Sequence, residues 1–141
     1  MALQFPSAPW ANAYKDAINQ NALYKKSAAG WNQGAIALVC QATPELGVPN
    51  AVGMVLDLAH GECHGVVYTD DRAVIDRTPF VIEASYVQWK AVIRGETDPI
   101  RAMLQGQLKL SKGHLPTIIK DVEGSKQLVM SASKIDTEFL G

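Results

Sequence analysis

The stretch GETDPIRAMLQGQLKLSKGHLPTIIKDV, residues 95–122, places a helix, a strand and a second helix in direct succession. Asp98 and Pro99 suit the N-cap and the first position of a helix, which Gly106 closes. The segment QLKLS that follows alternates polar and apolar residues, as strands do. From His114 onward, apolar residues recur every three or four positions. The last part of the chain is therefore predicted to be a long amphipathic helix.

The segments before this stretch predict a sheet. Short apolar or alternating runs indicate four strands, at residues 33–42, 52–59, 65–68 and 79–84. Polar residues 69–72 predict a turn after the third strand, and Ser85 is the expected N-cap of a helix that ends at Gly95. Because few residues separate the second and third strands, we expect these two strands to form a hairpin.

The N-terminal part predicts one further helix. Ser7 is its expected N-cap, Pro9 lies in its first turn, and the helix should end near Gly30. The element order is then helix, four strands, two helices, one strand and a C-terminal helix, interrupted only at Gly124. Strands grouped first and helices later predict an α+β fold in which helices cover one face of the sheet.

Length and composition restrict the function classes. The 141 residues are 48% hydrophobic, which predicts one domain over residues 1–141. Thirteen basic and fourteen acidic residues give a net charge of -1 without long runs of either sign, so we expect neither a nucleic acid nor an anionic membrane as a partner. No segment has the pattern of a signal peptide or a membrane span, which predicts a cytoplasmic protein without stable membrane insertion.

The fragment AHGECHG, residues 59–65, raises the question of a metal site. His60, Glu62, Cys63 and His64 are all competent donors, but alternate side chains of a strand point to opposite faces. Only Glu62 and His64 would share a face, and no second cluster completes a tetrahedral set. We therefore interpret the fragment as a hairpin turn and expect no metal.

Catalytic patterns are not evident in the sequence. It contains no GxSxG, GxGxxG or GxxxxGK[ST] motif, and Asp70, Asp71 and Asp76 fall where solvated turn residues are common. The apolar positions of the later helices fit two interpretations equally, a filled core or a wall that leaves room for an apolar ligand.

Residues 95–122 resemble the hallmark segment of the sterol carrier protein type 2 family. In that family a glycine closes one helix, an Asp-Pro or Asn-Pro pair opens the next, and a second glycine leads into a strand, a glycine-containing turn and an amphipathic helix. The matching positions here are Gly95, Asp98, Pro99, Ala102, Gly106, Leu108, Lys109, Leu110 and Gly113. The resemblance covers residues 33–135 and leaves 1–32 as a variable N-terminal helix.

The resemblance implies a five-stranded mixed sheet packed by helices, with a hydrophobic tunnel between the two layers. It implies non-catalytic binding, and transfer, of fatty acids, fatty acyl-CoA, sterols or similar apolar small molecules, without a cofactor. Burying an acyl chain contributes about 0.8 kcal/mol per methylene, so affinity should follow chain length. The predicted ligand-binding residues are Phe80, Ile82, Trp89, Ile93, Met103, Leu104, Leu108, Leu110, Ile118, Ile119 and Val122.

Two rival functions remain open. An enzyme of the ketosteroid-isomerase-like class also has an apolar pocket, but it needs an acidic base deep inside. Glu83 is the only carboxylate within an apolar strand, and alternation places it opposite Phe80 and Ile82. The other rival is an interaction domain that binds a protein partner and no small molecule, which would expose an apolar patch.

Overall fold

The computed structural model describes residues 2–140, and its main sheet has five strands. They are β2 (Ile36–Cys40), β3 (Val52–Ala59), β4 (Glu62–Thr69), β5 (Phe80–Ala84) and β6 (Lys109–Lys112). The spatial order is β4-β3-β2-β5-β6, with β2 and β5 parallel and the other neighbouring pairs antiparallel. The predicted α+β fold with one mixed sheet is confirmed.

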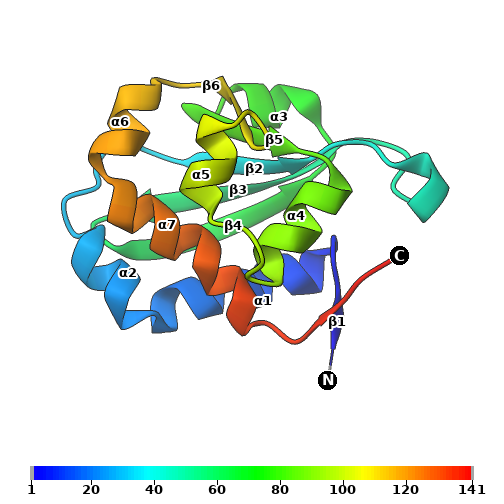
Figure 1. The fold of residues 1–141 in the computed structure, drawn as a ribbon, viewed down its shortest axis with the longest axis horizontal. Helices are drawn as coiled ribbons and strands as arrows, with labels where there is room; N and C mark the ends of the chain where they lie inside the picture. Colours follow the sequence, from blue (N-terminus) through cyan, green and yellow to red (C-terminus); the bar gives the residue numbers. More distant parts are fainter. Residues whose placement is uncertain (1, 141) are drawn as a thin grey trace.

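Helices lie on both faces of the sheet, but unequally. They are α1 (Ala8–Gln20), α2 (Ala22–Ser27), α3 (Arg72–Asp76), α4 (Tyr86–Ile93), α5 (Pro99–Leu104), α6 (Leu115–Lys120) and α7 (Val122–Met130). Two 3-10 turns, η1 (Pro44–Leu46) and η2 (Ser131–Lys134), complete the helical segments of the described chain. Figure 1 shows α1, α4, α5 and α7 on one side of the sheet and α3 on the other. The terminal strands β1 (Leu3–Gln4) and β7 (Thr137–Glu138) pair in parallel, so the first and last strands of the described chain lie side by side.

Alternation along the central strand β2 separates two cores. Ile36, Leu38 and Cys40 belong to the large buried cluster beneath the main helices. Ala37 and Val39 face the opposite way and form a small cluster, in which Ile75 of α3 is buried. The main helical layer thus covers the face that carries most of the apolar surface.

The predicted N-terminal helix is wrong in its length, because the structure breaks it at Asn21. The Asn21 backbone is extended, with φ -86° and ψ 100°. Its side-chain oxygen accepts hydrogen bonds from the amides of Leu23 and Tyr24, at 3.0 and 3.2 Å. Asparagine competes in this way with the helical backbone, so α1 ends and α2 starts at one residue.

The predicted C-terminal helix is also wrong, since it is interrupted at Asp121 and not at Gly124. Asp121 has φ -107° and ψ 50°, which separates α6 from α7. Gly124 lies inside α7, where a Cβ atom would stand 2.7 Å from both carboxylate oxygens of Asp121. The glycine therefore makes room for the side chain of the residue at the break.

Residues 69–72, predicted to form a polar turn, lead directly into the helix α3, which begins at Arg72. Asp71 caps α3, with its carboxylate accepting a hydrogen bond from the Ala73 amide at 3.0 Å. Ile75 is fully buried against the sheet, where a Cβ at Gly53 would lie 2.9 Å from its Cδ1. The missing side chain of Gly53 allows α3 to approach β3 closely.

Candidate functional site

The layer between the sheet and the main helices is the largest buried apolar region in residues 2–140. Strands contribute inward residues such as Leu38, Met54 and Ile82, and α4 contributes Trp89 and Ile93. The aromatic side chains from the N-terminal segment join the same cluster: Phe5, Trp10 and Tyr14. Phe5 and Trp10 pack edge to face, with ring centroids 4.7 Å apart.

Two small voids lie within this layer, each of about 10 Å³, which is about one water molecule. One is lined by Phe5, Pro6, Leu38, Cys40, Val52, Met54, Tyr68 and Trp89. The other is lined by Phe5, Trp10, Tyr14, Leu38, Met54, Trp89, Val92, Ile93, Val129 and Ala132. The layer is therefore closed in this structure, and a larger ligand has to displace side chains.

The polar atoms that reach into the layer bind backbone groups. The Tyr14 hydroxyl donates to the Leu128 carbonyl at 2.7 Å, and the Trp89 indole nitrogen donates to the Val39 carbonyl at 2.8 Å. Burial raises the pKa of Tyr14 well above its ordinary value of 10.0. The same effect raises the pKa of the Cys40 thiol to about 11. These groups stay neutral near pH 7, so the layer offers apolar contact and no charge.

The predicted ligand-binding residues fall into three groups. Phe80, Ile82, Trp89, Ile93, Leu108 and Ile118 are buried, and Met103 and Leu110 are half-buried. Leu104, Ile119 and Val122 are 64%, 41% and 43% exposed. Of these eleven residues, Trp89 and Ile93 line the voids. Contact of any of them with a ligand stays a prediction.

The prediction that Leu104, Ile119 and Val122 line a buried site is wrong, because all three side chains are exposed. The break at Asp121 ends α6, and Ile118 is the residue of that helix that points inward. Ile119, the next residue, then faces outward, since neighbouring helical residues do not share a face.

Sequence reasoning missed most of the side chains that line the voids, among them Phe5, Trp10, Tyr14, Leu38 and Met54. Helical spacing of Trp10 and Tyr14, and strand alternation at Leu38 and Met54, carry the signal for their burial. These patterns do not tell which residues of distant segments meet.

A crystal structure of sterol carrier protein 2 matches the chain with a TM-score of 0.85 and 33% identity, covering 92% of this chain and 97% of that one. The chain belongs to the sterol carrier protein 2 family. A conserved hypothetical protein of Thermus thermophilus, described as a possible sterol carrier protein, matches with a TM-score of 0.83 and 32% identity, covering 94% and 90%. Sterol carrier protein 2 from Yarrowia lipolytica, in its apo form, shares the fold at 16% identity and a TM-score of 0.56, covering 91% and 92%. No family model and no curated protein matches the chain.

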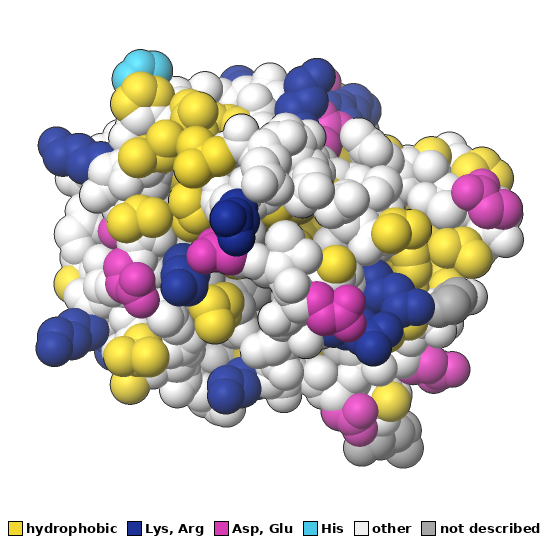
Figure 2. Space-filling model, viewed as in Figure 1, with side chains coloured by type: hydrophobic (Ala, Val, Ile, Leu, Met, Phe, Trp, Pro, Cys, Tyr) yellow, Lys and Arg dark blue, Asp and Glu magenta, His cyan; other side chains and the backbone are white. Residues whose placement is uncertain are grey.

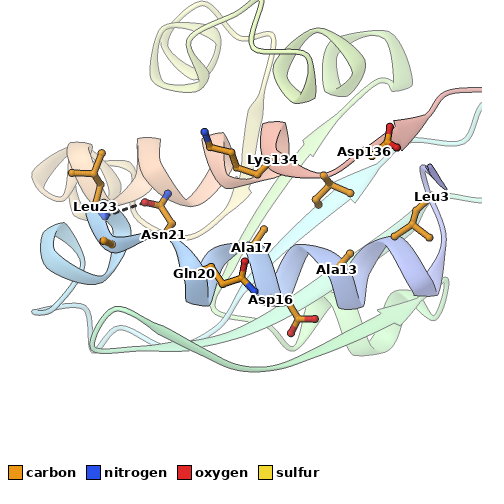
Figure 3. A pocket seen from close by; sticks show the side chains of 11 residues that line it. Leu3, Ala13, Asp16, Ala17, Gln20, Asn21, Leu23, Lys134 and Asp136 are labelled. Atoms are coloured by element: carbon orange, nitrogen blue, oxygen red, sulfur yellow. Dashed lines mark hydrogen bonds between the residues drawn. The ribbon is translucent and has the colours of Figure 1, made fainter. Parts of the chain in front are cut away.

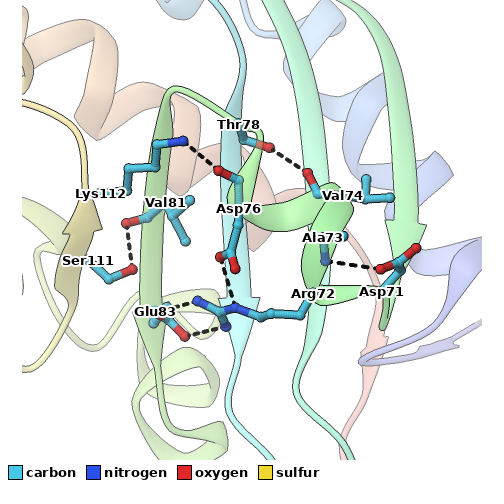
Figure 4. A network of polar contacts seen from close by, with 10 residues as sticks. All are labelled: Asp71, Arg72, Ala73, Val74, Asp76, Thr78, Val81, Glu83, Ser111 and Lys112. Carbon is cyan, nitrogen blue, oxygen red and sulfur yellow. Dashed lines mark hydrogen bonds and ion pairs between the residues drawn. The ribbon is translucent and has the colours of Figure 1, made fainter.

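Glu83 lies outside the apolar layer of this family member. It points to the α3 side of β5, whereas Phe80 and Ile82 belong to the large core cluster. Figure 4 shows that the Arg72 guanidinium donates two hydrogen bonds to its carboxylate, with N–O distances of 2.9 and 3.2 Å. The hydrogen bond from Arg72 is the main cause that lowers the pKa of Glu83. An ionised, paired carboxylate on this face does not fit the base of a ketosteroid-isomerase-like pocket.

The hairpin interpretation of AHGECHG is confirmed, since β3 and β4 are joined at His60 and Gly61. His60 has a positive φ of 53°, as the tight turn requires. Cys63 is buried, while Glu62 and His64 lie on the exposed face with 4.0 Å between Oε2 and Nε2. Within residues 2–140, no three His, Cys, Asp or Glu side chains gather as a metal site would need.

A surface groove of about 640 Å³ lies outside the closed layer and shares no lining residue with the two voids. Figure 3 shows Leu3, Ala13 and Ala17 along this groove, beside the segment that carries Lys134 and Asp136. None of the eleven predicted ligand-binding residues lines it. Its lining mixes apolar side chains with the charged residues Asp16, Lys134 and Asp136, and it is open to solvent, so it is not an enclosed apolar site.

Proposed function

We propose that this protein binds a lipid in the apolar layer between the sheet and the main helices. It transfers the lipid and does not catalyse a reaction on it. The ligand classes are fatty acids, fatty acyl-CoA and sterol-like molecules. The observation that carries the proposal is the pair of voids, which lie in the layer and are lined almost wholly by apolar side chains. Membership of the sterol carrier protein 2 family supports the same function.

Binding requires the closed layer to expand. Each buried methylene of a ligand contributes about 0.8 kcal/mol, so a long chain can offset the cost of separating packed side chains. Met54 lines both voids, and an unbranched thioether side chain repacks at low cost. Affinity should therefore rise with chain length and tolerate varied ligand shapes.

Absence of catalysis is part of the proposal. The titratable groups closest to the voids are buried tyrosine and cysteine side chains whose pKa values burial raises, such as Tyr14 and Cys40. Neutral groups of this kind do not act as a general base near pH 7. We accordingly propose no cofactor, and a single lipid-binding unit over residues 1–141. A cytoplasmic location stays a prediction from the sequence.

A substitution that fills a void tests the site. Ala132 lines one void, and Ala132→Met should occupy the space that a ligand needs. Ala11 is equally buried but lines neither void, so Ala11→Met is the matched control for the strain of a larger side chain. Titration with a fluorescent fatty acid and a fluorescent sterol should give saturable binding that Ala132→Met weakens and Ala11→Met leaves unchanged.

Native mass spectrometry of the purified protein, followed by organic extraction, identifies the bound class without a chosen probe. A lipid in near-equimolar amount would support the proposal. If the bare protein bound neither probe, or if Ala11→Met and Ala132→Met weakened binding equally, lipid binding in this layer would be refuted. Stable capture of a protein by such a preparation would favour the interaction-domain alternative.

A further inference from the structure

The N-terminal segment carries one aromatic side chain into the apolar layer. Phe5 follows β1, is 1% exposed and lines both voids. Apart from Pro6, every other residue that lines a void belongs to a strand of the main sheet, to a helix or to the 3-10 turn η2. Phe5 is therefore the part of the void lining that can move out without displacing a strand or helix of the core.

A recess at the surface lies next to one of these voids. It has a volume of about 150 Å³ and extends between the terminal segments and residues 47–50, which follow η1. Pro6, Val52 and Tyr68 line both the recess and the neighbouring void. In Figure 2, hydrophobic side chains reach the surface on the right, where Figure 1 places the η1 segment and the C-terminal end of the chain. The recess thus leads from solvent toward the closed layer, and Phe5, which lines the void but not the recess, lies on the inner side.

The segment that carries Phe5 is attached through short strands. β1 and β7 have two residues each, whereas the strands of the main sheet have four to eight. The Phe5 amide donates to the Glu138 carbonyl at 3.0 Å. The Tyr86 hydroxyl donates to the Phe5 carbonyl at 3.3 Å and accepts from the Leu140 amide at 2.6 Å. Pairing of this kind at a chain end opens at a lower free-energy cost than pairing within a core sheet.

Given the lipid site proposed above, on which this inference rests, we propose that residues 3–6 form its gate, with Phe5 as the plug. A lipid enters the apolar layer through the recess when β1 separates from β7 and Phe5 moves out. Because Phe5 lines both voids, its ring and the ligand compete for the same volume. Gln4, Asn50 and Asp70 line the recess, so an apolar chain enters first and the polar end of the lipid stays near these side chains.

A shorter plug tests the competition between Phe5 and the ligand. Phe5→Ala should raise the association rate constant of the fluorescent fatty acid about tenfold, since a larger fraction of the molecules then admits a ligand. Tyr24→Ala is the matched control, because Tyr24 is buried in the same cluster at 2% exposure and lines neither void. Stopped-flow fluorescence measures the rates, and urea denaturation checks that both variants fold. A purely structural role of Phe5 would lower stability without faster association.

A milder variant tests the attachment of the gate. Tyr86→Phe removes the hydroxyl that binds Phe5 and keeps the ring, so it should raise the association rate constant about threefold. Ser131→Ala is the control, because it removes a buried hydroxyl that donates to the Gln127 carbonyl, away from the gate.

A crosslink tests the gate in the opposite direction. Gln4 and Glu138 are exposed partners on β1 and β7, and the two cysteines of the chain, Cys40 and Cys63, are buried. Gln4→Cys with Glu138→Cys should form a disulfide that slows association about tenfold until a reductant breaks it. Gln4→Cys alone, treated with the same oxidant, is the control.

Equilibrium titration and association kinetics separate the gate from the lipid site itself. The gate is overturned, and lipid binding stands, if the unmodified chain binds lipid but Phe5→Ala and Tyr86→Phe associate no faster than their controls. Equal rates for the crosslinked and reduced forms would overturn it as well. Binding by Phe5→Ala in the absence of binding by the unmodified chain would support the gate. If both chains fold and neither binds, the gate and the lipid site are both refuted.

Discussion

At the scale of single residues, the Arg72–Glu83 ion pair on the α3 side of β5 makes the stability of the fold depend on pH. Glu83 is 16% exposed and Arg72 47%, and Arg72 also binds Asp76 at 3.0 Å. Because Arg72 lowers the pKa of Glu83, the carboxylate stays ionised in the folded protein to lower pH than in the unfolded chain. The pair therefore stabilises the fold above the ordinary carboxyl value of 4.5, and this stabilisation is lost as the pH falls through the folded value.

We expect Glu83→Gln to lower the free energy of unfolding by up to about 1 kcal/mol near neutral pH, since the pair is partly exposed. Below the folded pKa of Glu83, the protonated side chain resembles glutamine and the difference should vanish. Urea denaturation at about pH 7 and at a series of acidic pH values down to about pH 2 follows how this difference disappears. Glu45→Gln, at an exposed carboxylate of η1, is the control. An unchanged difference at the acidic pH would contradict this role of the pair.

Strand alternation was sufficient to predict that Glu83 lies opposite Phe80 and Ile82. Its partner was not predictable, because Arg72 belongs to a helix that the sequence suggested to be a turn. An ion pair depends on where two elements meet in space, and polar residues of a capped helix look locally like a turn.

At the scale of elements, the close approach of α3 to β3 depends on a glycine. A Cβ at Gly53 would stand 2.9 Å from Cδ1 and 3.0 Å from Cγ1 of Ile75. Gly53→Ala should therefore destabilise the fold by about 1–3 kcal/mol through overpacking. Gly65→Ala on β4 is the matched control, because no heavy atom lies within 4 Å of its added Cβ. Urea denaturation of both variants compares them directly.

A second variant separates packing from backbone effects. Ile75→Val removes the Cδ1 atom that an alanine at position 53 would approach most closely. Combined with Gly53→Ala, it should recover part of the lost stability. Equal destabilisation by Gly53→Ala and Gly65→Ala, with no recovery, would mean that strand propensity and not the approach of α3 sets the effect.

Apart from α3, the helical regions were predictable at this scale, but the helix boundaries were not. The spacing of apolar residues continues across both breaks, at Asn21 and at Asp121. Each break depends on a side chain that bonds to or lies against the following turn, and such local bonds compete with the helix.

At the scale of the whole molecule, residues 95–122 were sufficient to suggest the family, and the structural matches confirm it. The interior was less predictable. Phe5, Trp10 and Tyr14 line a void, although the sequence placed them in a variable helix outside the family-like core. Burial follows from local periodicity, whereas the shape of a cavity follows from contacts between distant segments.

Trp89 provides the most direct test of lipid binding, because it lines both voids. Trp10→Phe with Trp31→Phe leaves Trp89 as the only tryptophan. Its fluorescence should be quenched saturably, with near-equimolar stoichiometry, by a fatty acid or sterol that carries bromine within its apolar part. Saturable binding without quenching of Trp89, or no binding at all, would contradict a lipid site between the sheet and the helices.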